Sequence, residues 1–199
     1  SASMDNLLNY NRLVVIYLAC LAYTLTRYAY FGPIEPPNWP AYLINKSVSI
    51  FAVITFCYSS FVYLKGDHEL SKQLGRIVWQ AAVLHVLLSL ALLNPGYYRG
   101  FYGQTALRFG YIGEFMMLFG SLSIFMMWQI PKAKELVQHR YKQLAAILVF
   151  LHIIPTSITS EWHIPANWFG SLPPIGLIGG GASFITIILI WKYRTETDR

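Results

Sequence analysis

The sequence predicts an all-α membrane protein, a six-transmembrane-helix bundle that forms one domain over residues 1–199. Of the 199 residues, 55% are hydrophobic and only 12% are charged, and the mean hydropathy is +0.44. The apolar residues fall in long blocks instead of amphipathic periods, which is typical of helices that lie in lipid. These observations place the chain among integral membrane proteins.

Six blocks have the length of about 20 residues that a helix needs to cross ~30 Å of hydrocarbon. They cover residues 13–31, 43–64, 73–93, 109–130, 141–160 and 172–191. The first block lacks the short apolar core and the cleavage site of a signal peptide, so we expect it to be a true span. What remains is too short for a soluble domain that could hold a nucleotide or a flavin.

The distribution of Lys and Arg indicates the orientation. With six spans, both termini share one side with the loops that follow the second and fourth spans. That side holds eleven of the 15 Lys and Arg residues: Arg12, Lys65, Lys72, Arg76, Lys132, Lys134, Arg140, Lys142, Lys192, Arg194 and Arg199. Because cytoplasmic loops carry the excess of cations, we expect both termini in the cytoplasm. The net charge of +6 then follows from topology and anionic lipid, and it indicates no nucleic-acid partner.

Two of the five histidines, His85 and His152, lie inside predicted spans. A histidine at this depth is costly unless its ring nitrogens have partners, so an intramembrane histidine is a candidate functional residue. The alternative is a histidine that only forms a hydrogen bond across a helix interface. Of the others, His68 and His139 lie at the inner boundary, and His163 lies in the last outer loop.

The two intramembrane histidines are predicted to lie at matching depth. His85 lies nine residues beyond Arg76, and His152 lies ten beyond Lys142, which places both about 14–15 Å past the last cation of their helices. If the two helices are neighbours, the imidazoles can face each other as bis-histidine ligation of a haem iron requires. Space for a planar cofactor would come from glycines of the fourth span, Gly110, Gly113 and Gly120.

His139 cannot bind the same iron as His152. The two are thirteen residues apart on one helix, which corresponds to ~20 Å along the axis and about 220° around it. His139 is then either an interfacial side chain whose polar end reaches the aqueous boundary or a ligand or hydrogen-bond partner of a second, cytoplasm-side cofactor.

Two segments resemble a known family. The stretch LGRIVWQAAVLHVLL (74–88) resembles the first haem helix of ferric reductase-like transmembrane domains, and HRYKQLAAILVFLH (139–152) resembles the second haem helix of their MsrQ-type branch. The similarity covers all six spans in topology and about residues 71–160 in motif. It implies that His85 and His152 are the axial, metal-binding ligands of haem b and that His139 has a haem-associated role.

The same resemblance implies an electron-transfer subunit of a transmembrane oxidoreductase in the bacterial inner membrane. Members of the family relay electrons from a cytoplasmic flavin- or NAD(P)H-linked donor, or from quinol, to an external acceptor. Partner proteins are therefore expected on one or both sides, besides membrane lipid. The chain lacks the flavin and nicotinamide domains of larger members and the paired histidines of the two-haem pattern. One haem is expected; a second haem, or a quinone or flavin at the cytoplasmic side, stays an alternative.

Two further points stay open at the level of sequence. Arg99 and Arg108 near the outer surface could pair with haem propionates, because guanidinium matches carboxylate geometry, or could anchor phospholipid headgroups. A function of another class is also compatible, a non-redox subunit of a larger complex or a small transporter. In that case the histidines and Glu114 would serve packing or proton relay.

Overall fold

The computed structural model describes residues 2–33, 39–102, 108–159 and 161–197, and these residues form helices with no β-strand among them. The long helices are α1 (Ala2–Thr24), α2 (Trp39–Leu64), α3 (His68–Ala91), α4 (Tyr111–Gln129), α5 (Glu135–Ile153) and α7 (Ile175–Thr197). The short ones are η1 (Leu25–Tyr30), η3 (Arg99–Phe101), η4 (Ile130–Lys132), α6 (Thr156–Thr159), η5 (Pro165–Asn167) and η6 (Phe169–Ser171).

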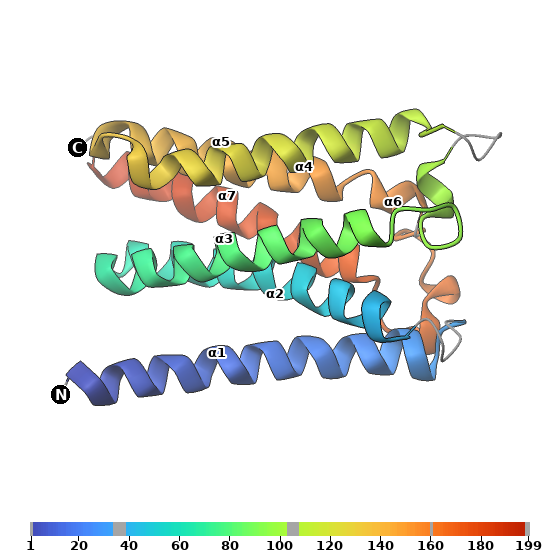
Figure 1. Ribbon diagram of the computed structural model, residues 1–199. Coiled ribbons are helices and arrows are strands. Elements are labelled where there is room, and N and C mark those ends of the chain that lie inside the picture. The colour runs from blue at the N-terminus through green and yellow to red at the C-terminus, as the bar shows by residue number, and fades with distance from the viewer. Residues whose placement is uncertain (1, 34–38, 103–107, 160, 198–199) are drawn as a thin grey trace.

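Within the described residues, six helical stretches are long and apolar enough to cross a membrane, which confirms the predicted number of spans. They cover Tyr10–Tyr30, Pro40–Leu64, His68–Ala91, Tyr111–Lys132, Val137–Thr159 and Phe169–Lys192. The helix axes lie side by side, and successive spans run in opposite directions. Both termini lie at the same end of the bundle (Figure 1). We call this the terminal end, and the end with the connections that follow η1, α3 and α5 the loop end.

Two predicted spans depart from a continuous α-helix. The fifth was expected over 141–160, but α5 ends at Ile153 and the short α6 follows. Pro155 explains the break, because proline lacks the N–H of a helix hydrogen bond and its ring disfavours a continuous helix. The first span ends in the π-helical η1. π-Helices are rare overall, and those that occur often lie near functional sites.

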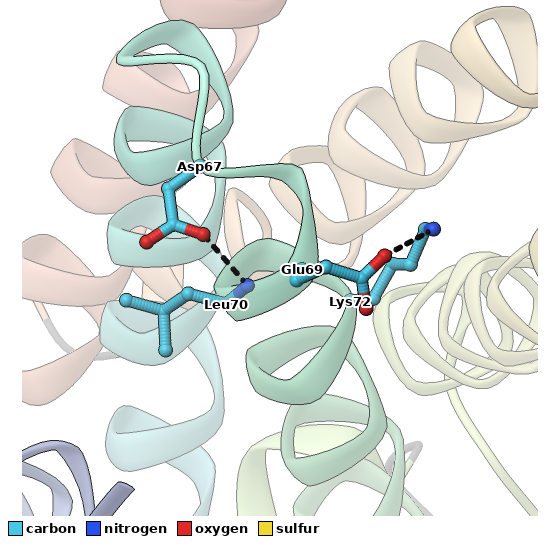
Figure 2. Close-up of polar contacts among 4 residues, drawn as sticks. All are labelled: Asp67, Glu69, Leu70 and Lys72. Carbon is cyan, nitrogen blue, oxygen red and sulfur yellow. Dashed lines mark hydrogen bonds and ion pairs between the residues drawn. The ribbon is translucent and has the colours of Figure 1, made fainter. Parts of the chain in front are cut away.

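Helix α3 begins at a defined cap near the terminal end. The Asp67 carboxylate accepts a hydrogen bond from the backbone N–H of Leu70 at 3.0 Å, and Lys72 pairs with Glu69 at 2.8 Å (Figure 2). The cap satisfies one of the free N–H groups at the helix start. The Lys72–Glu69 pair is exposed, so it adds little stability.

Helix α2 lies at the centre of the bundle and packs against α1, α3 and α7. Its contact with α3 includes a reciprocal pair of hydrogen bonds. Each hydroxyl of Ser59 and Ser71 donates to the other residue's backbone carbonyl at 3.0 Å. Small hydroxyl residues of this kind allow close approach of membrane helices and connect them. Large apolar side chains such as Leu87, Leu118 and Ile188 are exposed on the outside of the bundle, as lipid contact requires.

Arg27 joins the first span to the segment before α7. Its side chain is buried, and Nη1 donates hydrogen bonds to the backbone carbonyls of Phe169, at 3.4 Å, and of Leu172. The guanidinium also lies 5.1 Å from the centre of the Phe169 ring, a cation–π arrangement. Arg27 thus connects η1 to the chain around η6 at the loop end.

Candidate functional site

His85 of α3 and His152 of α5 line the same cavity, which we call the histidine cavity. Its volume is about 230 Å³, and α2, α3, α4, α5 and α7 all contribute to its wall. Helix α3 packs mainly on α2, whereas α5 packs on α4 and α7. Among the described residues, the closely packed helix pairs do not include α3 with α5. The two histidine helices are therefore held by different neighbours and border a shared space.

The His85 ring is fixed by a residue of α2. Its Nδ1 lies 2.7 Å from Oδ1 of Asn45, and Asn45 is only 1% exposed. An amide oxygen can only accept, so Nδ1 of His85 is the donor and carries the hydrogen. The other ring nitrogen, Nε2, makes no hydrogen bond to the described part of the chain and keeps its lone pair.

The His152 ring is fixed in the same way by a backbone group of α4. Its Nδ1 lies 2.7 Å from the carbonyl oxygen of Met116, which again can only accept. Gly120, one helical turn further on, gives the ring its place: a Cβ at Gly120 would lie 2.8 Å from Nδ1 of His152. Of the three glycines expected to provide cofactor space, Gly120 alone is among the described lining residues, while Gly113 packs against Phe101.

Together these contacts give the cavity two imidazoles in the tautomer that binds metal through Nε2. Histidines that bind metals almost always donate their other ring N–H to a carbonyl, carboxylate or water, which fixes tautomer and orientation. Among the described residues no three His, Cys, Asp or Glu side chains are grouped to hold a metal ion. A haem iron needs only two protein ligands, so this donor set fits a haem better than a free ion. Methionines 116, 117 and 127 in the wall are flexible enough to adapt to a ligand.

Among the described side chains, the cation that lines the histidine cavity is Lys46 of α2. Lys46 lies next to Asn45 in the chain, and its Nζ is 5.2 Å from the Tyr42 ring and 5.7 Å from the Tyr98 ring. Arg108 is exposed and is not among the described lining residues. The backbone of Arg99 belongs to η3 at the loop end, and its side chain lies outside the described residues.

A second cavity of about 900 Å³ lies toward the terminal end, and His139 lines it. We call it the basic cavity, because its described wall has cations and histidines but no acidic side chain. These residues are His68, Lys72, Arg76, Lys132, His139 and Lys142. The structure thus brings His68 and His139 to one cavity, although His68 is exposed at the start of α3 and His139 is half-buried. Gly75 leaves open space at this wall.

Sequence reasoning identified the two histidines but missed the residues around them. Asn45, Lys46 and Tyr98 all belong to the histidine cavity or its hydrogen bonds. A signal was present, because an Asn–Lys pair inside an apolar span is as costly as an intramembrane histidine and calls for a partner. Backbone acceptors such as the carbonyl of Met116 leave no signal in a sequence.

The fold and the site define a class, that of polytopic helical membrane proteins with paired histidines at a common internal cavity. The comparisons with known proteins do not narrow this class. No protein-family model matches the chain, and neither a curated protein nor a solved structure matches it.

Proposed function

We propose that the protein is a membrane cytochrome b, in which His85 and His152 bind the iron of one haem b in the histidine cavity. The observation that supports this most is the pair of imidazoles at one cavity, each with Nδ1 bonded to an acceptor and Nε2 available. The resemblance of 74–88 and 139–152 to the haem helices of ferric reductase-like domains agrees with it. Bound there, haem would supply single-electron transfer.

The residues of the chain would hold the haem and orient its two imidazole ligands. Asn45 and the Met116 carbonyl orient the two rings, and the wall of the cavity is mostly apolar. Lys46 supplies a positive charge beside it, which suits the carboxylate groups of a porphyrin. The sequence offered Arg99 and Arg108 as candidates for this role; of Lys46 and Arg108, Lys46 is the one that lines the cavity.

The basic cavity is the proposed entry point for electrons. If the positive-inside rule holds, the terminal end faces the cytoplasm of a bacterial inner membrane, and a flavin- or NAD(P)H-linked donor, or quinol, would reach the protein there. The cations of this cavity favour an anionic or electron-rich ligand: a second haem near His139, a quinone or a flavin. The acceptor, and any redox partner protein, would then lie at the loop end.

A non-redox role is the competing function, and one observation favours it. The hydrogen bonds of His85 to Asn45 and of His152 to Met116 cross helix interfaces, as those of purely structural histidines do. Glu114 gives this alternative no support, because it is exposed on α4 and is not among the described residues that line the histidine cavity.

Colour separates the two functions. Protein purified from haem-replete cells should be red, with a Soret band that sharpens and shifts on reduction by dithionite. Colourless protein that is folded would contradict the cytochrome and leave the non-redox function.

Replacement of either ligand tests the site itself. His85→Ala and His152→Ala should each abolish or greatly reduce haem content while the protein still inserts, because each removes one of the two axial ligands. The measurement is the haem-to-protein ratio after purification. His163→Ala is the matched control, since His163 is exposed at the loop end and its loss should leave the ratio unchanged. Bis-histidine spectra from both ligand variants would eliminate this site.

A further inference from the structure

Asn45 differs from the other buried polar residues of α2, because its whole amide is engaged at the histidine cavity. Oδ1 accepts from Nδ1 of His85 at 2.7 Å, and Nδ2 donates to the Tyr98 hydroxyl at 2.7 Å and to Oγ of Ser89 at 3.1 Å. Tyr98 is itself buried and stacked on Phe101, with ring centres 5.0 Å apart. The amide is thus held from both sides.

In the structure the Oδ1 end of the amide faces Nδ1 of His85, and the Nδ2 end faces the Tyr98 hydroxyl. Nδ2 needs acceptors, and Tyr98 provides one, while Ser89, whose Oγ also lies 3.5 Å from Nδ1 of His85, provides another. If the amide were reversed, Nδ2 would face Nδ1 of His85, and the ring would have to carry its hydrogen on Nε2. That tautomer has no lone pair on Nε2 and cannot bind a metal through it.

We propose that Asn45 is the positioning residue that keeps the hydrogen of His85 on Nδ1, and that its acceptor strength sets how strongly Nε2 of His85 binds iron. A stronger acceptor at Nδ1 makes the imidazole a better donor to the metal. Second-shell hydrogen bonds of this kind are one of the levers that set the potential of a haem. The redox part of this inference rests on the proposed function; the tautomer part does not.

The redox part predicts shifts of opposite sign from two substitutions. Asn45→Asp places a stronger acceptor at Nδ1, which stabilises ferric iron and should lower the midpoint potential. Asn45→Leu removes the acceptor and should raise the potential, with haem affinity reduced about 10- to 100-fold, as is typical when such a partner is lost. Tyr98→Phe frees the amide to turn and should shift the potential in the same direction as Asn45→Leu, but less.

A matched control separates this role from simple damage to α2. Thr55 is fully buried on the same helix and is not among the described residues that line the histidine cavity, so Thr55→Val should leave the potential at its wild-type value. If haem is bound and both Asn45 variants keep that value, or shift it in the same direction, the inference is overturned while the cytochrome stands.

The tautomer is measured in haem-free protein, so colourless wild-type protein still permits a test. Solid-state NMR of the full chain with ¹⁵N-labelled histidine reports which ring nitrogen carries hydrogen, and His85→Gln identifies the signals of His85. The wild type should show hydrogen on Nδ1, and Asn45→Leu should show a mixture of tautomers. Hydrogen on Nε2 in the wild type, or the same pure Nδ1–H form in Asn45→Leu, would contradict the inference.

Discussion

Gly120 is the residue on which the position of the His152 ring depends. The ring lies against the backbone of α4, where a glycine is the only residue that leaves it room. This close approach brings Nδ1 within 2.7 Å of the Met116 carbonyl. At the scale of single residues, the cavity therefore depends on an absent side chain as much as on the imidazoles.

Replacement of Gly120 by a larger residue should displace the His152 ring. In Gly120→Ala the new methyl group would lie 2.8 Å from Nδ1 of His152, and such overpacking costs about 1–3 kcal/mol of folding stability. The displaced ring should also weaken haem binding, by roughly 5- to 150-fold where the whole cost falls on the bound form. Haem titration of purified protein measures the change. Gly181→Ala is the control, because nothing lies within 4 Å of its added methyl group. Equal affinities in the two variants would show that ring position is unimportant.

His139 provides the second test at this scale. Both His139 and His152 belong to the continuous helix α5, and they are ~20 Å apart along its axis. His139→Ala should therefore leave the bis-histidine spectrum of the histidine cavity intact, and loss of that spectrum would contradict the two-cavity arrangement.

The haem-to-protein ratio of the same variant decides what the basic cavity holds. A ratio that falls from two to one, with the loss of one of two redox transitions, assigns a second haem to His139. A ratio of one in both proteins excludes a second haem there. His68→Ala is the companion variant, because His68 lines the same cavity from α3.

At the scale of elements, each half of the histidine cavity belongs to a helical hairpin. Helix α2 holds His85 of α3 through Asn45, and α4 holds His152 of α5 through the Met116 carbonyl. Each imidazole is thus oriented by the helix that precedes its own helix in the chain. Neither of these two hydrogen bonds connects one hairpin to the other.

The elements themselves could be predicted from the sequence, and their interruptions only in part. Long apolar blocks predict spans because a helix must satisfy its own backbone in lipid, and all six are present. Pro155 carried the signal for the end of α5, although the span was expected to continue to residue 160. The π-helical turn of η1 had no such signal.

The buried histidines of the site could be predicted from the sequence, but their hydrogen-bond partners could not. Histidines in apolar blocks stand out because their burial is costly, so His85 and His152 were found. The role of Asn45 depends on which residue of a neighbouring helix faces His85, and the rotation of α2 against α3 follows from packing that a single sequence does not determine. The spacing of residues along each helix predicted the depth of His85 and His152 in the membrane, but not the direction that each ring faces.

At the scale of the whole molecule, the main result is which termini and connections lie at each end of the bundle. Both termini and the α2–α3 and α4–α5 connections lie at one end (Figure 1), as six spans require. Most of the Lys and Arg residues belong to this end. The positive-inside rule therefore predicts that the terminal end faces the cytoplasm.

Labelling of single cysteines measures this orientation. Lys65 is exposed in the α2–α3 connection at the terminal end, and His163 is exposed between α6 and η5 at the loop end. Lys65→Cys and His163→Cys are therefore made in a background without Cys20 and Cys57. A membrane-impermeant thiol reagent added outside intact cells should label position 163 and not 65. The reverse labelling pattern would contradict the predicted orientation and would reverse the proposed direction of electron transfer.

The hairpin arrangement also has a consequence for biosynthesis. The chain is made from its N-terminus, so Asn45 precedes His85 and Met116 precedes His152 as the helices leave the ribosome. Each imidazole can thus find its hydrogen-bond partner as soon as its own hairpin has entered the lipid, and neither has to wait unpaired for the other half of the protein. The complete cavity exists only after α7, which also contributes to its wall, has been inserted, so a cofactor would be loaded late, into hairpins whose imidazoles are already oriented.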